Sequence, residues 1–196
     1  NIKATEIKDL AKEIWTDIEN LIQETNYELK KFLRYYWISE NSFITEKHLY
    51  KEIKKKVTDW DKFLDDLWKS SQLFNLLLNG NDRLWKNQPY KHPIDLYNSS
   101  NAIKSMGVSQ CYVLFLNLLK NYEILNYDLR HIFRVVENFS FVYSAVCKLP
   151  ANKIERVYSR FALQINEAIK MDTDKKRLTR IQQIFGNLEQ ELRDLK

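Results

Sequence analysis

The stretch CYVLFLNLL, from Cys111 to Leu119, is the longest predominantly apolar run in this chain of 196 residues. Its nine residues are about half of what a helix needs to cross a bilayer, so we expect no membrane partner. A helix that is apolar around most of its circumference is typical of a protein interior. The run therefore predicts a helix buried on most sides, from Ser109 to Lys120.

The composition around this run favours helices. With 44% hydrophobic and 29% charged residues, the chain has the composition of a folded protein rather than a disordered one. Gly and Pro occur only 3 times each, which argues against a sheet joined by many tight turns. The sequence predicts an all-α fold, a multi-helix bundle of about eight helices with no sheet. We expect it to form a single helical domain over residues 1–196.

Apolar residues at three- and four-residue intervals place the helices. The first pattern runs from Ile7 to Trp37, with a break expected near Thr25 and Asn26. Thr58 followed by Asp61 resembles a capping box at the start of a later helix. The segment 81–100 holds two of the three prolines and little periodicity, so it is expected to be the longest loop. The other helices are expected at about residues 45–57, 58–79, 99–107, 109–120, 126–148, 152–170 and 173–196.

The last expected helix carries a heptad seam, in which apolar residues alternate steps of three and four: Leu178, Ile181, Phe185, Leu188, Leu192 and Leu195. The first 29 residues are acidic, with three Lys against seven Asp or Glu, and the segment Lys175–Arg180 is basic. We expect the two terminal helices either to pack on each other or to self-associate. Self-association would make the chain a homo-oligomer. One hypothesis is therefore a protein–protein interaction module with no nucleic-acid role.

Several chemistries have no support in the sequence. Three glycines in all cannot form a glycine-rich phosphate loop, and no G-x-S-x-G elbow is present. His48, His92 and His131 lie far apart without ligand spacing, so no metal and no cofactor are expected. His131, beside Arg130 and Asp128, is either a proton-transfer site or one turn of a charged helix. We expect no catalytic residue and no enzyme activity in this chain alone.

The two cysteines, Cys111 and Cys147, share no metal-binding spacing. They are expected to be buried free thiols. Together with the absence of a recognisable signal peptide, they predict a reduced, cytoplasmic protein.

Two basic blocks carry the net charge of +5. Residues 30–56 hold eight Lys or Arg against three Glu, and residues 148–180 hold nine against four. At about 100° per residue, the cations of the first block lie opposite the apolar stripe of each helix. They are either a solvated face or a surface that contacts the phosphates of nucleic acid. The candidate phosphate-binding residues are Lys30, Lys31, Arg34, Lys47, Lys51, Lys54 and Lys55.

The aromatic residues of the first block give less support for base stacking. A single-strand binder needs aromatic rings exposed among the cations. On the helical wheel Phe32, Tyr36 and Trp37 belong to the core stripe, Tyr50 lies on the apolar arc of its helix, and only Tyr35 is placed among the cations. Base-specific readout has no support.

Two stretches carry a family resemblance. They are FLRYYWIS…FITEKHLYKEIK, from Phe32 to Lys54, and LRHIFRVVENFSFVYSAVCKLPANKIERVYSRFA, from Leu129 to Ala162. Both resemble the helical region of GmrSD-type modification-dependent restriction endonucleases. Between them, GVSQCYVLFLNLL, from Gly107 to Leu119, is similar to a glycine-bounded turn that enters a buried helix in that family.

In that family the helical region follows a ParB-like, nucleotide-dependent domain, and many members end in an HNH-type nuclease domain. This sequence has neither motif, so no catalytic residue can be transferred. The resemblance implies a non-catalytic scaffold from a longer, prokaryotic phage-defence protein, with flanking NTPase and nuclease domains as partners. It adds DNA backbone as an expected ligand of the basic face.

Overall fold

The computed structural model describes residues 2–146 and 151–195, and this part of the chain is all-α, as predicted, with no strand. It contains eleven α-helices and one π-helical segment rather than about eight helices. They are α1 (Ile2–Glu24), α2 (Leu29–Glu40), α3 (Glu46–Lys56), α4 (Trp60–Asn79), α5 (Asp82–Lys86), α6 (Pro93–Ser105), α7 (Tyr112–Lys120), α8 (Tyr122–Leu125), α9 (Arg130–Ser140), η1 (Phe141–Val146), α10 (Ala151–Ala168) and α11 (Asp174–Asp194).

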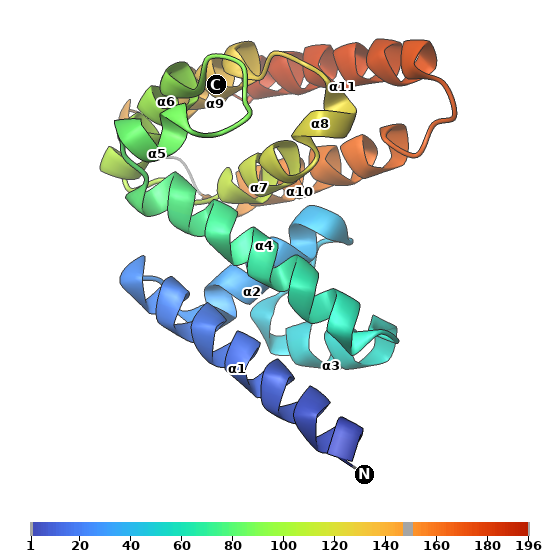
Figure 1. The fold of residues 1–196 in the computed structure, drawn as a ribbon. Helices are drawn as coiled ribbons and strands as arrows, with labels where there is room; N and C mark the ends of the chain where they lie inside the picture. The colour runs from blue at the N-terminus through green and yellow to red at the C-terminus, as the bar shows by residue number, and fades with distance from the viewer. Residues whose placement is uncertain (1, 147–150, 196) are drawn as a thin grey trace.

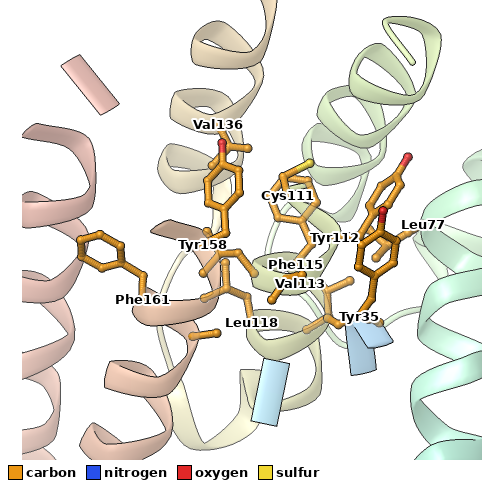
Figure 2. Packing of buried hydrophobic residues seen from close by; sticks show 14 of the residues in the cluster. Tyr35, Leu77, Cys111, Tyr112, Val113, Phe115, Leu118, Val136, Tyr158 and Phe161 are labelled. Atoms are coloured by element: carbon orange, nitrogen blue, oxygen red, sulfur yellow. The ribbon is translucent and has the colours of Figure 1, made fainter. Parts of the chain in front are cut away.

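The predicted buried helix is α7, and it lies at the centre of the molecule (Figure 1). It packs against α2, α4 and α10, and all its residues except Lys120 are buried. Figure 2 shows Phe115 and Leu118 of α7 among the side chains of neighbouring helices. The Phe115 ring stacks on Phe133 of α9 with 3.9 Å between centroids. No helix in the described part of the chain is long and apolar enough to cross a membrane.

The expected break in the first helical pattern is confirmed. α1 ends at Glu24, and Asn26 adopts a left-handed conformation with φ of 60° before α2 begins. The carbonyl of Ile22 accepts hydrogen bonds from the hydroxyl of Thr25 at 2.6 Å and from the N–H of Thr25 at 3.0 Å, so this carbonyl at the helix end is satisfied. The chain therefore turns here, α1 packs against α4, and α2 enters the core.

The expected loop at 81–100 is partly wrong, because it contains α5 and the start of α6. The side chain of Asn81 accepts a hydrogen bond from the N–H of Leu84 at 3.1 Å and so caps α5. Pro93 occupies the first turn of α6, where its missing N–H costs nothing. These helices begin through capping chemistry, whereas the prediction relied on apolar periodicity.

Three other helix starts differ from the prediction. The cap of α4 is Asp59, which accepts from the N–H of Lys62 at 3.0 Å, in place of a box formed by Thr58 and Asp61. Asn126 does not cap the following helix: it is left-handed, with φ of 44°, at the end of α8. α9 starts four residues later, and α10 begins at Ala151 rather than after Asn152.

The heptad seam of α11 is confirmed as a buried stripe, but its partners lie within the same chain. Ile181, Phe185, Leu188 and Leu192 are buried where α11 packs against α8, α9 and α10, and only Leu178 among the described seam residues is well exposed. The seam is therefore already occupied and does not offer an apolar stripe to a second copy. The expected packing of the terminal helices on each other is also wrong, since α1 and α11 lie at opposite ends of the molecule (Figure 1).

The predicted buried thiol is confirmed for Cys111. Its side chain is fully buried, and this burial raises the pKa of the thiol well above its ordinary value. Cys147 lies outside the described residues.

Candidate nucleic-acid interface

Helix α3 presents the clearest cationic surface among the predicted residues. Leu49 and Ile53 are buried and fix one side of the helix, which packs on α2. Four lysines on the rest of its surface are exposed, and none forms an ion pair with any residue whose side chain the structure describes. These four residues, which we call the α3 basic face, are Lys47, Lys51, Lys54 and Lys55.

Lys30 and Lys31 of α2 are less available than predicted. Lys30 is exposed, but its ammonium lies 3.4 Å from the carboxylate of Glu46 at the start of α3. Lys31 is half-buried, with its ammonium 5.0 Å from the centre of the Tyr27 ring. Lys30 thus extends the α3 basic face across a surface ion pair, and Lys31 covers aromatic rings of the core.

Arg34 was expected on the exposed cationic side of α2, and this is wrong. Its residue exposure is only 9%. Its Nη1 and Nη2 donate to the two carboxylate oxygens of Glu155 on α10, at 2.8 and 2.6 Å, and Nε donates to the carbonyl of Ile44 at 2.8 Å. The wheel placed Arg34 opposite one apolar stripe, but α2 is covered on that side as well, by α10 and the chain before α3.

The predicted exposures of Tyr35 and Tyr50 are both wrong, and each residue has the exposure that was predicted for the other. Tyr35, expected among the cations, is 1% exposed, and its hydroxyl donates to Ser109 Oγ at 2.9 Å. Tyr50, expected on the apolar arc of α3, is 76% exposed. Only Leu49 and Ile53 of α3 are buried, so the buried stripe is too narrow to cover a ring about 100° away.

The second basic block, residues 148–180, meets the first at the start of α3, and the sequence did not predict this contact. The guanidinium group of Arg156 on α10 lies 4.2 Å from the centre of the Phe43 ring, and that of Arg34 lies 5.2 Å from it. Arg156 also lines a pocket of about 330 Å³ together with Thr45 and Glu46. The exposed Arg156 therefore adds a cation close to the N-terminal end of the α3 basic face.

The cluster around His131 forms a pocket of about 500 Å³ between α6 and α9, but its charges are paired. Asp128 accepts hydrogen bonds from Arg130, which lower the pKa of its carboxyl. His131 Nε2 lies 3.1 Å from Glu189 Oε2 on α11, and this contact, with that of Arg193, lowers the pKa of Glu189. His131 and Asp128 thus have separate partners and do not form a proton-transfer pair.

Other acidic residues also serve structural contacts. Asp65 and Asp66 have different partners, and Asp65 is bonded to Lys69 at 2.7 Å. Asp66 does not lie on a solvated face: it accepts from Lys120 at 2.6 Å and from the hydroxyl of Tyr36 at 2.8 Å. Within the described residues, no three metal-ligating side chains gather where they could hold an ion.

Comparisons with family models, with curated proteins and with solved structures find no match for this chain. The resemblance to the GmrSD-type helical region therefore rests on the quoted stretches of sequence alone, and the α3 basic face rests on its geometry.

Proposed function

We propose that this chain is a non-catalytic helical scaffold that contacts the phosphate backbone of DNA through the α3 basic face. The observation that carries the proposal is that Lys47, Lys51, Lys54 and Lys55 are exposed and make no ion pair with the described side chains. A lysine that is paired with a carboxylate must give up that partner when it binds a phosphate. These four lysines have no such partner to lose in the described part of the chain. Each of these ammonium groups that neutralises a phosphate releases a counterion condensed on the DNA, and this release is the main source of non-specific affinity for DNA.

The resemblance supplies the context of the proposal. In a GmrSD-type protein, the flanking nucleotide-dependent and nuclease domains would carry the catalysis, and this domain would hold them on DNA during phage defence. The contact that we propose is with phosphates and not with base edges, so it depends on charge and salt rather than on sequence.

Binding of a fluorescein-labelled duplex, measured by anisotropy between about 50 and 200 mM salt, tests this function. Four phosphate contacts predict that log K falls against log salt with a slope of about −3.6. The triple variant K51E/K54E/K55E should bind at least about tenfold more weakly and with a shallower slope.

The matched control reverses three exposed lysines elsewhere, as K86E/K91E/K176E, and changes the net charge by the same amount. This control should retain most of the affinity. The proposal fails if the wild-type protein shows no measurable affinity at about 50 mM salt. It also fails if the two triple variants weaken binding equally, because the effect would then be one of net charge.

A further inference from the structure

The α3 basic face contains one feature that contact with phosphates does not use, the exposed ring of Tyr50. Its exposure of 76% is the highest among the exposed large hydrophobic side chains that the structure describes. The tyrosines of the core differ, because Tyr35 and Tyr36 are buried and donate to Ser109 and Asp66. The hydroxyl of Tyr50 has no hydrogen-bond partner among the described residues.

The position of Tyr50 on α3 places its ring among the cations. Lys47 precedes it by three residues and Lys54 follows by four, and residues at these spacings are neighbours on a helix surface, with Cβ atoms about 5–6 Å apart. Lys51 is the next residue, about 100° around the helix. A ring with cations before it and after it along one face is the arrangement of a platform for stacked bases.

The duplex form of nucleic acid would not engage this ring, because its bases stack on one another and present only edges in the grooves. A single strand offers both a charged backbone and free π-faces. We infer that the α3 basic face binds single-stranded nucleic acid, with Tyr50 stacking on a base while Lys47, Lys51 and Lys54 contact the adjoining phosphates. This inference rests on the proposed contact with phosphates and specifies the form of nucleic acid.

Three oligonucleotides of equal length separate the two proposals: a duplex, a single-stranded oligo-dT, and a single strand of abasic sites with the same phosphates. The wild-type protein should bind oligo-dT more tightly than the abasic strand. Tyr50→Ala should weaken binding of oligo-dT by about five- to a hundredfold, and leave binding of the abasic strand and the duplex unchanged. Tyr50→Trp should restore affinity for oligo-dT.

A matched control, Phe141→Ala, removes another exposed ring. Phe141 lies on η1, away from the α3 basic face, so this substitution should not change any of the three affinities. Equal melting temperatures for wild type and Tyr50→Ala would show that the fold is intact. If the duplex and the abasic strand bind but Tyr50→Ala does not affect oligo-dT, the stacking inference is overturned and the phosphate contact stands. If none of the three oligonucleotides binds, both proposals are overturned.

Discussion

Arg34 shows how one residue can connect distant parts of this fold. Its guanidinium group bonds both oxygens of Glu155, which lies 121 residues further along the chain. Both side chains are nearly buried, with exposures of 11% and 13%, so water screens the pair little. The planar fork of Arg matches a carboxylate in a way that Lys cannot, which gives this position a specific geometry as well as a charge.

Arg34→Met should lower the free energy of unfolding by about 3–5 kcal/mol, because it leaves the carboxylate of Glu155 buried without its partner. Urea unfolding at pH 7 measures the change. The double variant R34M/E155L should recover most of the loss, since an apolar pair of similar volume avoids the cost of burying charge. A loss below about 1 kcal/mol for the single variant would show that Glu155 finds water or another cation instead.

At this scale the sequence predicted the α3 basic face and missed its surroundings. The exposed side of α3 was predicted correctly for Lys47, Lys51, Lys54 and Lys55, because the wheel located the buried side at Leu49 and Ile53. The same wheel assigned Tyr50 to the buried side, which is wrong. Arg34 and Tyr35 were misplaced because α2 is enclosed by α7, α10 and the chain before α3. Contacts between residues 74 or 121 positions apart, such as those of Tyr35 with Ser109 and of Arg34 with Glu155, leave no periodic signal in a single sequence.

At the scale of elements, the single polar residue in the CYVLFLNLL run has a defined role. The amide of Asn117 donates to the carbonyl of Ser39 at 2.9 Å and to Asn166 Oδ1 at 2.7 Å. Asn166 itself donates to the carbonyl of Ser39 at 3.0 Å, and Ser159 to that of Ile38 at 3.1 Å. The C-terminal carbonyls of α2, which a buried helix end would leave unsatisfied, are thus capped by α7 and α10.

The α11 seam can be tested with two identical substitutions on one helix. Leu188→Ala should cost about 2–5 kcal/mol, because Leu188 is fully buried and its removal leaves a cavity. Leu178→Ala should cost less than about 1 kcal/mol, because Leu178 is 41% exposed. The two changes share the same helix propensity, so their difference in chemical unfolding reports packing alone. Equal costs would contradict the burial of the seam within the chain.

The seam also marks the limit of sequence-based prediction for whole elements. Its spacing gave four of the five buried residues of α11, because burial on a helix follows the same period whatever the partner. It missed the buried Ile184 and included the exposed Leu178. It did not identify the partner, since a heptad stripe packs on another copy or on its own chain equally well. Complementary charge does not identify a partner either: α1 and α11 lie at opposite ends of the molecule although the terminal segments carry opposite charge (Figure 1).

At the scale of the whole molecule, the sequence predicted the fold class but not the short connecting helices or the contacts between distant helices. The scarcity of Gly and Pro was enough for an all-α fold, and capping residues added short helices that apolar periodicity did not show. The junction of α2, α4 and α7 was unexpected. There Lys120 lies 3.2 Å from Glu40 and 2.6 Å from Asp66, and its ammonium is 5.6 Å from the centre of the Tyr36 ring.

This junction makes the stability of the whole molecule depend on pH. Burial raises the pKa of the Glu40 carboxyl above its ordinary value of 4.5, and the attraction of Lys120 offsets only part of that effect. The folded protein therefore binds this proton more tightly than the unfolded chain does. Linkage then requires the contribution of Glu40 to the free energy of unfolding to fall as pH rises from about 4.5 through the folded pKa.

Glu40→Gln removes this titration while keeping the size and polarity of the side chain. The free energy of unfolding of the wild type minus that of the variant should be largest below pH 4.5, fall as the pH rises above it, and then level off. Urea titrations between about pH 4 and pH 7 measure this difference, in which the opposite contributions of Asp128 and Glu189 cancel because both proteins retain them. Parallel curves for the two proteins would mean that Glu40 binds its proton equally well in the folded and unfolded states. The ammonium of Lys120 would then compensate the burial of the carboxylate fully, and the junction would hold α2, α4 and α7 together without any dependence on this proton.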